Sequence, residues 1–461
     1  MKQSMNLRIP GLVTQLIAVL WVVWSCGATG APEVLDHEPS RVPIGPLTLG
    51  VWLPAGLDEF RFGADDQARL EALGVNYIEW LQPAVVDEWT AEQWAMDFCD
   101  RTGHRMPVYY PPPGFTAYDK LHNWATTTTV EPDFALQVRE RVVGLRQQWD
   151  GAPGFHGYLV GHEDYSSDFY EALRRTVRVL SEEDAARPAL TVGRLDAYAS
   201  PTAFMDAFFD ESGEPNIFQH EHYIFTGDLP THGKRFQRRV DDLVRGYQQV
   251  TNGLQGRLGR WHAIVQVHSE KREGPGFSQH KYRKPTPAEI RLQAGLALTR
   301  GAAGIIYFVY SSGLEELRDG DGVVRELRTY GGLVDSQGMP TERYDGVRAL
   351  NQELRALGSR LEKLHFHGSF SSRRLRLNPL VLSTAPALEF GLFGDGLNAD
   401  TALILNRRTT ESRVVEIGVG GGEVVDLLTD QRLEVIDGKI SLELASAGWR
   451  LLHLRELPEV E

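Results

Sequence analysis

Three glutamates stand in or just after apolar runs of strand length. Glu163 and Glu221 lie toward the ends of such runs, and Glu270 follows another closely. A pair of carboxylates at a suitable separation can hydrolyse a glycosidic bond, because one protonates the leaving oxygen while the other attacks the anomeric carbon or activates water. Glu163, Glu221 and Glu270 are therefore the catalytic candidates of this sequence.

The surroundings of the three glutamates differ. Alternate residues of a strand share a face, which would put Glu221 beside Gln219 and Tyr223. Because Glu221 lies inside an apolar run, where an unpaired charge is costly, it is hard to explain as a solvated loop residue. Glu270 opens a charged stretch and is better explained as a solvated residue. We therefore rank Glu221 ahead of Glu270 as the second carboxylate beside Glu163.

Other side chains at or near the ends of the apolar runs could contact a sugar. Sugar sites combine aromatic walls with a few polar groups that hydrogen-bond hydroxyls. The candidates for substrate binding are Trp52, Glu79, Trp80, Tyr110, Arg194, Tyr223, Gln266, His268 and Tyr310. Core packing of the aromatic residues and rim salt bridges of the charged ones are the alternative explanations.

The stretch His220-Glu221-His222 also invites a metal interpretation, since imidazoles and carboxylates bind zinc. On a strand the two histidines would point away from Glu221, toward a covering layer of helices, so we expect no metal site. No strand end carries a lysine for Schiff-base chemistry, and no nucleotide-binding loop is present. The sequence predicts no cofactor.

The pattern that carries these residues predicts an α/β fold, a (β/α)8 TIM barrel. Eight short apolar runs alternate with helical patterns, as in βα units around a parallel sheet. The runs cover residues 47–54, 75–83, 105–111, 155–164, 189–195, 216–225, 261–267 and 304–311. The first run lacks the Gly-rich turn of a doubly wound nucleotide-binding sheet, so a closed barrel is favoured. In such a barrel the active site lies at the carboxyl ends of the strands, where the candidate residues stand.

Helical patterns follow each run. They cover residues 65–73, 91–101, 133–148, 167–182, 202–210, 234–254, 287–300 and 341–361. Thr286 and Glu289 form the pattern of a capping box at the start of one of them. Past residue 363 the pattern changes to short strands broken by Gly, Asn and Asp, typical of a small β-sandwich. We predict a barrel domain over residues 45–362 and a sandwich domain over 363–461.

The first thirty residues have the layout of a secretory signal. Lys2 and Arg8 precede the apolar run 12–24, and small residues follow it. The alternative is a lipobox-like signal in which Cys26 carries a lipid anchor. We expect an exported protein in the periplasm, at the cell surface or outside the cell, without a membrane span in the mature chain. The net charge of −14 argues against nucleic acid as a partner.

The stretch 157–164 and the segment 283–308 resemble the strand-4 region and the strand-7 to strand-8 connection of clan-A barrel glycoside hydrolases, especially bacterial galactosidase-like members with a trailing β-sandwich. The resemblance implies a carbohydrate substrate and gives Glu163 the role of general acid/base. Where that family has a glutamate nucleophile at the end of strand 7, this sequence has Gln266, and Glu270 comes four residues later. Glu221 is the alternative source of the second carboxylate.

Two further functions compete with a glycoside hydrolase acting on an oligo- or polysaccharide. A catalytically silent carbohydrate-binding barrel on the cell surface is favoured by Gln266. A polysaccharide lyase would use a Tyr or His base on an acidic sugar, and the negative charge of the chain argues against it unless a local Arg/Lys cluster overrides that field.

Overall fold

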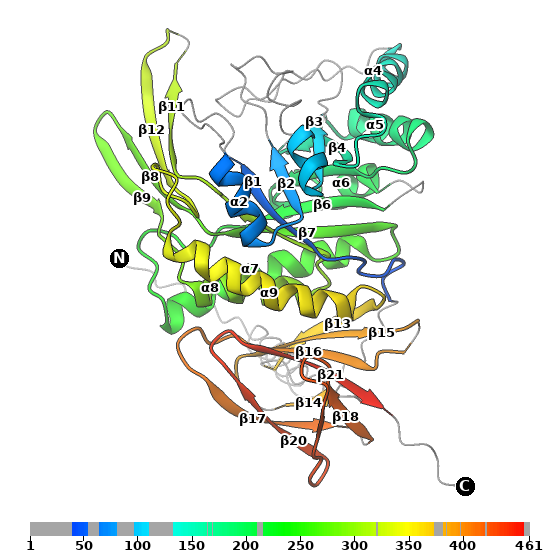
Figure 1. The fold of residues 1–461 in the computed structure, drawn as a ribbon, viewed down its shortest axis with the longest axis vertical. Helices are drawn as coiled ribbons and strands as arrows, with labels where there is room; N and C mark the ends of the chain where they lie inside the picture. Colours follow the sequence, from blue (N-terminus) through cyan, green and yellow to red (C-terminus); the bar gives the residue numbers. More distant parts are fainter. Residues whose placement is uncertain are drawn as a thin grey trace, which may run out of the picture.

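The structure is a computed structural model (Figure 1). It describes residues 39–53, 64–80, 96–109, 132–163, 165–167, 169–209, 215–319, 321–372, 381–383, 385–396, 398–419 and 422–455. The predicted signal segment with Cys26 lies outside these residues, as do Tyr110 and the side chain of Trp80. Within the described part, no helix is long and apolar enough to span a membrane.

Eight parallel strands form a barrel in the order β2-β1-β10-β7-β6-β5-β4-β3. Their bounds are β1 (Thr48–Leu53), β2 (Tyr77–Trp80), β3 (Met106–Tyr109), β4 (Phe155–His162), β5 (Ala189–Gly193), β6 (Asn216–Glu221), β7 (Gly259–Gln266) and β10 (Gly304–Phe308). A parallel bridge between Tyr77 and Arg105 joins the two ends of this order, so β2 meets β3 and the sheet closes. Each strand coincides with one of the predicted runs, and the predicted fold class is confirmed.

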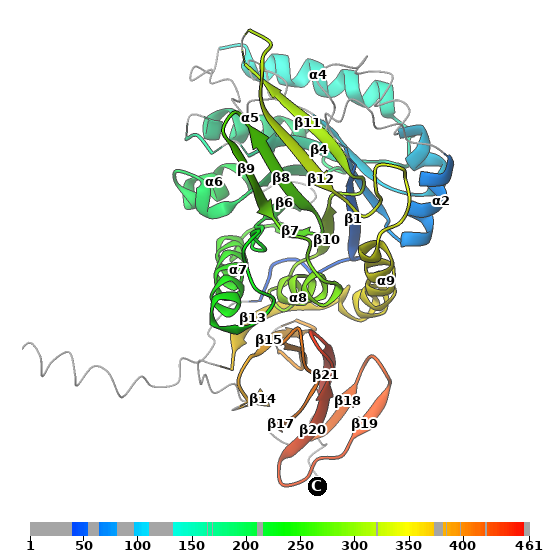
Figure 2. The ribbon, with the colours of Figure 1, turned by 90° about the vertical axis from the view of Figure 1, so that its left-hand side faces the viewer.

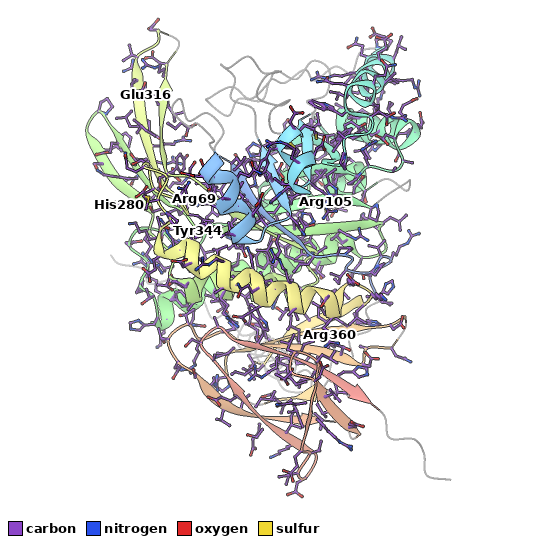
Figure 3. The ribbon with its side chains drawn as sticks, viewed as in Figure 1. Arg69, Arg105, His280, Glu316, Tyr344 and Arg360 are labelled. Atoms are coloured by element: carbon purple, nitrogen blue, oxygen red, sulfur yellow. The ribbon has the colours of Figure 1, made fainter. Side chains whose placement is uncertain are left out.

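Helices cover the outside of the barrel. They are α2 (Ala64–Leu73), α4 (Phe134–Trp149), α5 (Phe169–Glu183), α6 (Pro201–Phe208), α7 (Gly233–Leu254), α8 (Pro287–Leu298) and α9 (Glu342–Leu361), with the short η1 (Leu195–Ala197), and residues 96–102 are also helical. The predicted capping box is present at the start of α8, where Thr286 and Glu289 satisfy each other's backbone N–H groups. Tyr344 of α9 lies beside Arg69 of α2, and its hydroxyl donates to the Arg69 carbonyl at 2.6 Å, which joins the last helix to the first (Figure 3).

Two hairpins that the sequence analysis did not predict extend from the carboxyl face of the barrel. β8 (Ser269–Gly274) and β9 (Phe277–Tyr282) follow β7, while β11 (Gly313–Arg318) and β12 (Val324–Gly331) follow β10. They pair into one antiparallel sheet in the order β11-β12-β8-β9. Both ribbon views place this sheet on the side away from the C-terminal strands (Figures 1 and 2). These strands are rich in charged residues, so they do not stand out as apolar runs.

The C-terminal region is a β-sandwich, as predicted. One sheet has the order β13-β15-β16-β21-β18-β19 and the other β14-β17-β20. The strands are β13 (His365–Ser371), β14 (Val381–Leu382), β15 (Leu388–Gly394), β16 (Thr401–Asn406), β17 (Arg413–Val419), β18 (Glu423–Asp426), β19 (Gln431–Leu433), β20 (Lys439–Leu444) and β21 (Trp449–Arg455). Buried Phe390, Ile404, Ile417 and Leu442 pack between the two sheets.

The sandwich packs against α7, α8 and α9 (Figure 2). Leu405 and Trp449 belong to the same hydrophobic core as the barrel residues. A buried ion-pair network crosses the contact, because the Glu389 carboxylate accepts from Arg300 at 2.5 Å and from Arg407 at 2.8 Å. All three side chains are almost completely buried. At the periphery Arg360 of α9 pairs with Asp430 at 2.9 Å (Figure 3). The two domains therefore share one core.

Candidate active site

A cavity of about 530 Å³ opens at the carboxyl ends of the barrel strands. This volume is within the usual range of ligand pockets. Its lining brings together all three carboxylates named from the sequence, Glu163, Glu221 and Glu270. Of the predicted substrate-binding residues, those that line it are Trp52, Arg194, Tyr223 and His268. We refer to this cavity as the active-site pocket.

Glu163 follows the last residue of β4 and has a left-handed backbone, with φ of 53°. Side-chain-bearing residues adopt this conformation rarely, and it persists only where the surroundings enforce it. Its backbone N–H donates to the Val192 carbonyl of β5 at 2.8 Å, which fixes the turn at the strand end. The half-buried side chain lines the active-site pocket. Such local strain at a strand end is typical of a functional position.

Glu221 is the last residue of β6, and its carboxyl group shares a hydrogen bond with that of Glu163. Burial, together with the negative charge of Glu163, raises the pKa of Glu221 well above its usual value. Two tyrosines oppose this shift by donating to the carboxylate, Tyr165 at 3.4 Å and Tyr223. Glu221 is thus the carboxyl group of the pair that holds a proton more firmly than an ordinary glutamate.

Aromatic rings form the wall beside the carboxyl pair. Tyr223 packs edge-on against His268, with ring centroids 4.9 Å apart, and lies 5.6 Å from Phe308. His268 Nδ1 donates to the Phe308 carbonyl at 3.0 Å, and burial lowers the pKa of this imidazole to about 3, so it is neutral. The indole N–H of Trp52 is buried and has no hydrogen-bond partner among the described residues. The wall therefore offers ring faces and an unused donor, which is what a sugar ring requires.

The sheet β11-β12-β8-β9, which we call the hairpin wall, forms another side of the active-site pocket. It carries most of the charged side chains that line the pocket. Glu270 is the second residue of β8, and it accepts from Arg272 at 2.5 Å and lies 3.7 Å from Lys281. From β12, Arg328 lies 3.6 Å from Glu315, and the Tyr330 hydroxyl donates to that same glutamate at 3.1 Å. Apart from Glu270, sequence reasoning missed these residues, because the charged strands that carry them show no regular alternation of apolar and polar residues.

Three predicted substrate-binding residues lie outside the lining. Glu79 is fully buried inside the barrel, where it accepts from Tyr77 at 2.5 Å and from Gln219 at 2.8 Å. The Gln266 carboxamide accepts from the Phe225 backbone N–H at 3.0 Å and so holds the segment after β6. The Tyr310 hydroxyl donates to Asp66 of α2 at 3.0 Å. These three side chains support the barrel around the pocket instead of lining it.

Of the two histidines beside Glu221, His220 lies on the helix side of the strand, as the strand pattern indicated, whereas His222 contacts α7 and also lines the active-site pocket. His220 packs against the ring of Tyr247 in α7, with centroids 5.8 Å apart. Gly246 of α7 gives space to both imidazoles, because a Cβ at this position would lie 2.8 Å from His222 Nδ1 and 3.2 Å from His220 Nε2. The described residues contain no group of His, Cys, Asp and Glu arranged to hold a metal ion.

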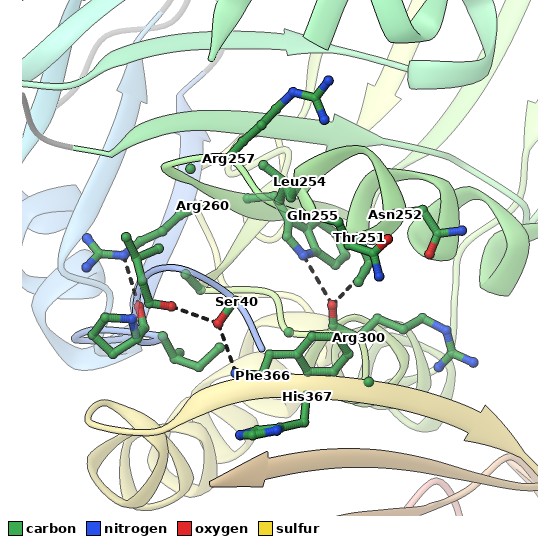
Figure 4. Close-up of a pocket in the computed structure, with 18 of the residues that line it drawn as sticks. Ser40, Thr251, Asn252, Leu254, Gln255, Arg257, Arg260, Arg300, Phe366 and His367 are labelled. Atoms are coloured by element: carbon green, nitrogen blue, oxygen red, sulfur yellow. Dashed lines mark hydrogen bonds between the residues drawn. The ribbon is translucent and has the colours of Figure 1, made fainter. Parts of the chain in front are cut away.

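A second, smaller pocket lies at the opposite end of the barrel (Figure 4). Its volume is about 50 Å³, and it lies between α7, residues 366–368 of β13 and residues 40–44. Thr251 and the Trp261 indole both donate to the Arg300 carbonyl in its wall, at 2.8 and 3.3 Å. Its described lining contains no carboxylate, so it offers no carboxyl pair like that of the active-site pocket.

No protein-family profile matches the sequence, and no curated protein matches it. Several solved structures have the same fold. A GH42 β-galactosidase from G. stearothermophilus has a TM-score of 0.52 at 8% identity, covering 90% of this chain and 100% of that one. The fold is that of the (β/α)8 glycoside hydrolases.

Two further structures extend this likeness. A GH27 β-L-arabinopyranosidase from Geobacillus stearothermophilus, in complex with arabinose, has a TM-score of 0.51 at 11% identity and covers 89% of this chain and 97% of that one. AmyP in complex with maltose has a TM-score of 0.51 at 12% identity, covering 90% and 97%. In each case the alignment spans both the barrel and the C-terminal region of this chain, since it covers about nine tenths of its length.

Proposed function

We propose that this protein is a glycoside hydrolase that cleaves O-glycosidic bonds in the active-site pocket with Glu163 and Glu221. The observation that carries the proposal is the hydrogen-bonded carboxyl pair, placed at the strand ends of a barrel pocket large enough for a sugar. The solved structures of like fold support the same activity, since two of them are glycosidases, one of these with bound arabinose, and a third binds maltose.

The electrostatics of the pair favour roles opposite to those expected from the sequence. Two carboxyl groups in contact cannot both ionise easily, so the ionisation of one raises the pKa of the other. Burial and the charge of Glu163 raise the pKa of Glu221, which favours Glu221 as the group that carries the proton. In the resting site Glu221 is then the general acid, and the ionised Glu163 is the nucleophile.

The closeness of the two groups favours a mechanism with retention of configuration. Retaining glycosidases hold their carboxyl groups at about 5–5.5 Å, whereas inverting ones leave about 6.5–9.5 Å for a water molecule. Glu163 and Glu221 contact each other directly, so a bound sugar must move them apart, and the smaller displacement leads to the retaining spacing. A bound sugar would break the hydrogen bond between the two carboxyl groups. Its glycosidic bond would then lie between them, with one carboxyl group on each side.

The proposed reaction has two displacements. The Glu163 carboxylate attacks the anomeric carbon and forms an ester, while the bond to the leaving oxygen breaks and that oxygen takes the proton of Glu221. In the second step the Glu221 carboxylate accepts a proton from water, and the hydroxide attacks the anomeric carbon. The ester bond breaks and the Glu163 carboxylate is regenerated with Glu221 again protonated.

Glu270 is a weak candidate for the second carboxylate. It is almost completely buried and is held by Arg272 at 2.5 Å, with Lys281 3.7 Å from its other oxygen. A carboxylate held by a guanidinium at hydrogen-bond distance is a poor nucleophile, because attack requires it to give up this partner. We assign Glu270 to the organisation of the hairpin wall.

We also propose that the protein is exported under the direction of residues 1–30, on the basis of their basic and apolar pattern. Sequencing of the mature N-terminus tests this. A start near Ala31 supports free secretion, a lipidated Cys26 supports anchoring at a membrane surface, and an intact Met1 in mature protein contradicts export.

The activity is tested with a panel of 4-nitrophenyl glycosides and unmodified oligosaccharides. We expect wild-type hydrolysis of at least one sugar, and a loss in Glu221→Gln of about 10²–10⁴-fold on plain glycosides but much less on 4-nitrophenyl glycosides, whose leaving group needs little protonation. Glu163→Gln should lose turnover on both substrate types. Sugar binding without hydrolysis by the wild-type protein would instead identify a carbohydrate-binding barrel.

A further inference from the structure

A β-bulge in the hairpin wall brings Lys281 into the active-site pocket. In the register of β8 and β9, Glu270 pairs with Tyr282 and Lys271 pairs with His280, so Lys281 has no partner on β8. The extra residue of a bulge leaves the strand alternation, and its side chain is redirected. As a result the consecutive residues Lys281 and Tyr282 both line the pocket, whereas in a regular strand they would face opposite ways.

The backbone around this bulge is fixed by the segment after β6. The Gly227 N–H donates to the Lys281 carbonyl at 3.1 Å, and Thr226 forms a bridge with Tyr282. The approach is so close that a Cβ at Gly227 would lie 2.1 Å from the carbonyl oxygen of His280, the residue that marks β9 in Figure 3. The position of Lys281 is therefore set by contacts from two sides of the pocket.

The ammonium group of Lys281 lacks a close partner. Its nearest carboxylate is Glu270 at 3.7 Å, beyond hydrogen-bond distance, and Glu270 already accepts from Arg272 at 2.5 Å. Its Nζ also lies 4.9 Å from the centre of the Tyr282 ring. Burial lowers the pKa of Lys281, while the charges of Glu270 and Glu163 oppose the shift, so the ammonium lies within electrostatic reach of the catalytic pair.

The other three cations that line the pocket have close carboxylate partners. Arg194 donates to Asp196 at 2.6 Å, and Arg328 donates to Glu326 at 2.6 Å. Arg272 is taken by Glu270, as described. In a chain with a net charge of −14, four cationic side chains line one pocket, and among the described residues Lys281 is the one whose donors are unused. A partly desolvated ammonium with unused donors forms its strongest hydrogen bonds with an anionic acceptor.

We propose that Lys281 binds the carboxylate of a uronic acid residue in the sugar that occupies the pocket. The proposal rests on the proposed glycosidase function and specifies its substrate class as an acidic glycan. The aromatic wall of Tyr223 and Phe308 would contact the sugar ring, while the hairpin wall supplies the charge. The negative charge of the chain as a whole does not exclude such a substrate, because four cationic side chains line the pocket beside its four glutamates, and no carboxylate lies within hydrogen-bond distance of Lys281 among the described residues.

The test compares 4-nitrophenyl glucuronides and galacturonides with the matching glucosides and galactosides of both anomeric configurations. We expect the wild-type protein to prefer a uronide, and Lys281→Met to raise its KM by about tenfold to a hundredfold, as the loss of a hydrogen bond to a charged group does. The KM for the neutral glycoside should rise much less than that for the uronide, and Lys281→Arg should keep part of the preference. Lys271→Met is the matched control, because Lys271 lies on the same hairpin, pairs with Glu273 at 2.7 Å and does not line the pocket.

Binding measured by calorimetry separates this inference from the proposed function. We expect Glu163→Gln to bind glucuronic or galacturonic acid more tightly than glucose or galactose, and to lose that difference when Lys281→Met is added. Uronic acid binding without any hydrolysis by the wild-type protein would contradict the glycosidase function and leave the binding assignment in place. Equal affinity for acidic and neutral sugars, or tighter binding of a sulfated sugar than of the uronic acid, would overturn it. Melting curves of each variant establish that it is folded.

Discussion

The carboxyl groups of Glu163 and Glu221, at the ends of β4 and β6, share a hydrogen bond in the active-site pocket. The contact ties two strands that are separated in the barrel by β5 and makes the ionisation of each group depend on the other. A bound sugar that separates the two groups would remove this coupling. The pair is therefore set to bind one proton in the empty pocket.

The left-handed backbone of Glu163 predicts that glycine is more stabilising than alanine at this position. Glycine adopts φ near 53° without the steric cost of about 1–2 kcal/mol that a Cβ imposes. We expect Glu163→Gly to be inactive but about 1 kcal/mol more stable than Glu163→Ala in urea unfolding, since both variants remove the carboxylate and differ only at the backbone. Equal stability of the two variants would show that the turn is not strained.

Tyr165 predicts a shift in the pH dependence of activity. Its hydroxyl donates to Glu221 and favours the ionised form, so Tyr165→Phe should raise the pKa of Glu221 further. Because the general acid would then keep its proton to higher pH, the basic limb of the kcat/KM profile should move upward. Tyr170→Phe, whose hydroxyl accepts from the Ser200 backbone N–H, is the control. A limb that moves downward in Tyr165→Phe would contradict the assignment of the acid.

Glu79 predicts a pH dependence of stability. Burial raises the pKa of Glu79 from 4.5 to about 7, against the opposing hydrogen bonds of Tyr77 and Gln219. The unfolded chain releases this proton near pH 4.5 and the folded one only near pH 7, so the free energy of unfolding falls as pH rises across this window, by about 3 kcal/mol at most. Glu79→Gln should flatten that slope and be the more stable protein at pH 8. A slope unchanged in Glu79→Gln would assign the effect to other groups.

The ion-pair network between the domains predicts a large loss of stability on neutralisation of Glu389. Glu389→Gln leaves the buried Arg300 and Arg407 without their shared carboxylate, and removal of one partner from a buried pair costs about 3–5 kcal/mol. The matched control is Glu353→Gln, which breaks the more exposed pair with Arg291 and should cost less than about 1 kcal/mol. Thermal unfolding followed by calorimetry measures both, and similar small losses would contradict a joint core.

The strands of the barrel could be predicted because each is buried on both sides and reads as an apolar run. The placement of Glu163 and Glu221 followed from the same pattern, since both come at the ends of such runs. Their direct contact could not be predicted, because the stagger between β4 and β6 depends on how the barrel closes. The assignment of the proton to Glu221 also needs the burial of this group, which the sequence does not specify.

The sequence pattern predicted neither the hairpin wall nor that Glu79, Gln266 and Tyr310 would lie outside the pocket lining. Lys281 and Arg328 lie on strands with polar residues on both faces, and such a sequence resembles that of a solvated loop. The bulge that redirects Lys281 depends on how β8 and β9 pair, which the sequence pattern does not show. Gln266 shares the strand alternation of pocket residues, yet its carboxamide is used by the Phe225 backbone. Alternation gives the face of a strand, whereas the neighbouring segments decide which side chains reach the pocket.

Chemical rescue by azide tests the roles of the carboxyl pair most directly. With a 4-nitrophenyl glycoside of the preferred sugar, Glu163→Ala should be nearly inactive and regain turnover in sodium azide, giving a glycosyl azide of configuration opposite to the substrate, because azide replaces the missing nucleophile. Glu221→Ala should give a glycosyl azide with the configuration retained, because azide then attacks the ester on Glu163. Proton NMR of the two products provides the measurement. If the two variants gave each other's products, Glu221 would be the nucleophile and Glu163 the general acid. If no azide product formed and the wild-type protein were inactive, the glycosidase function itself would be contradicted.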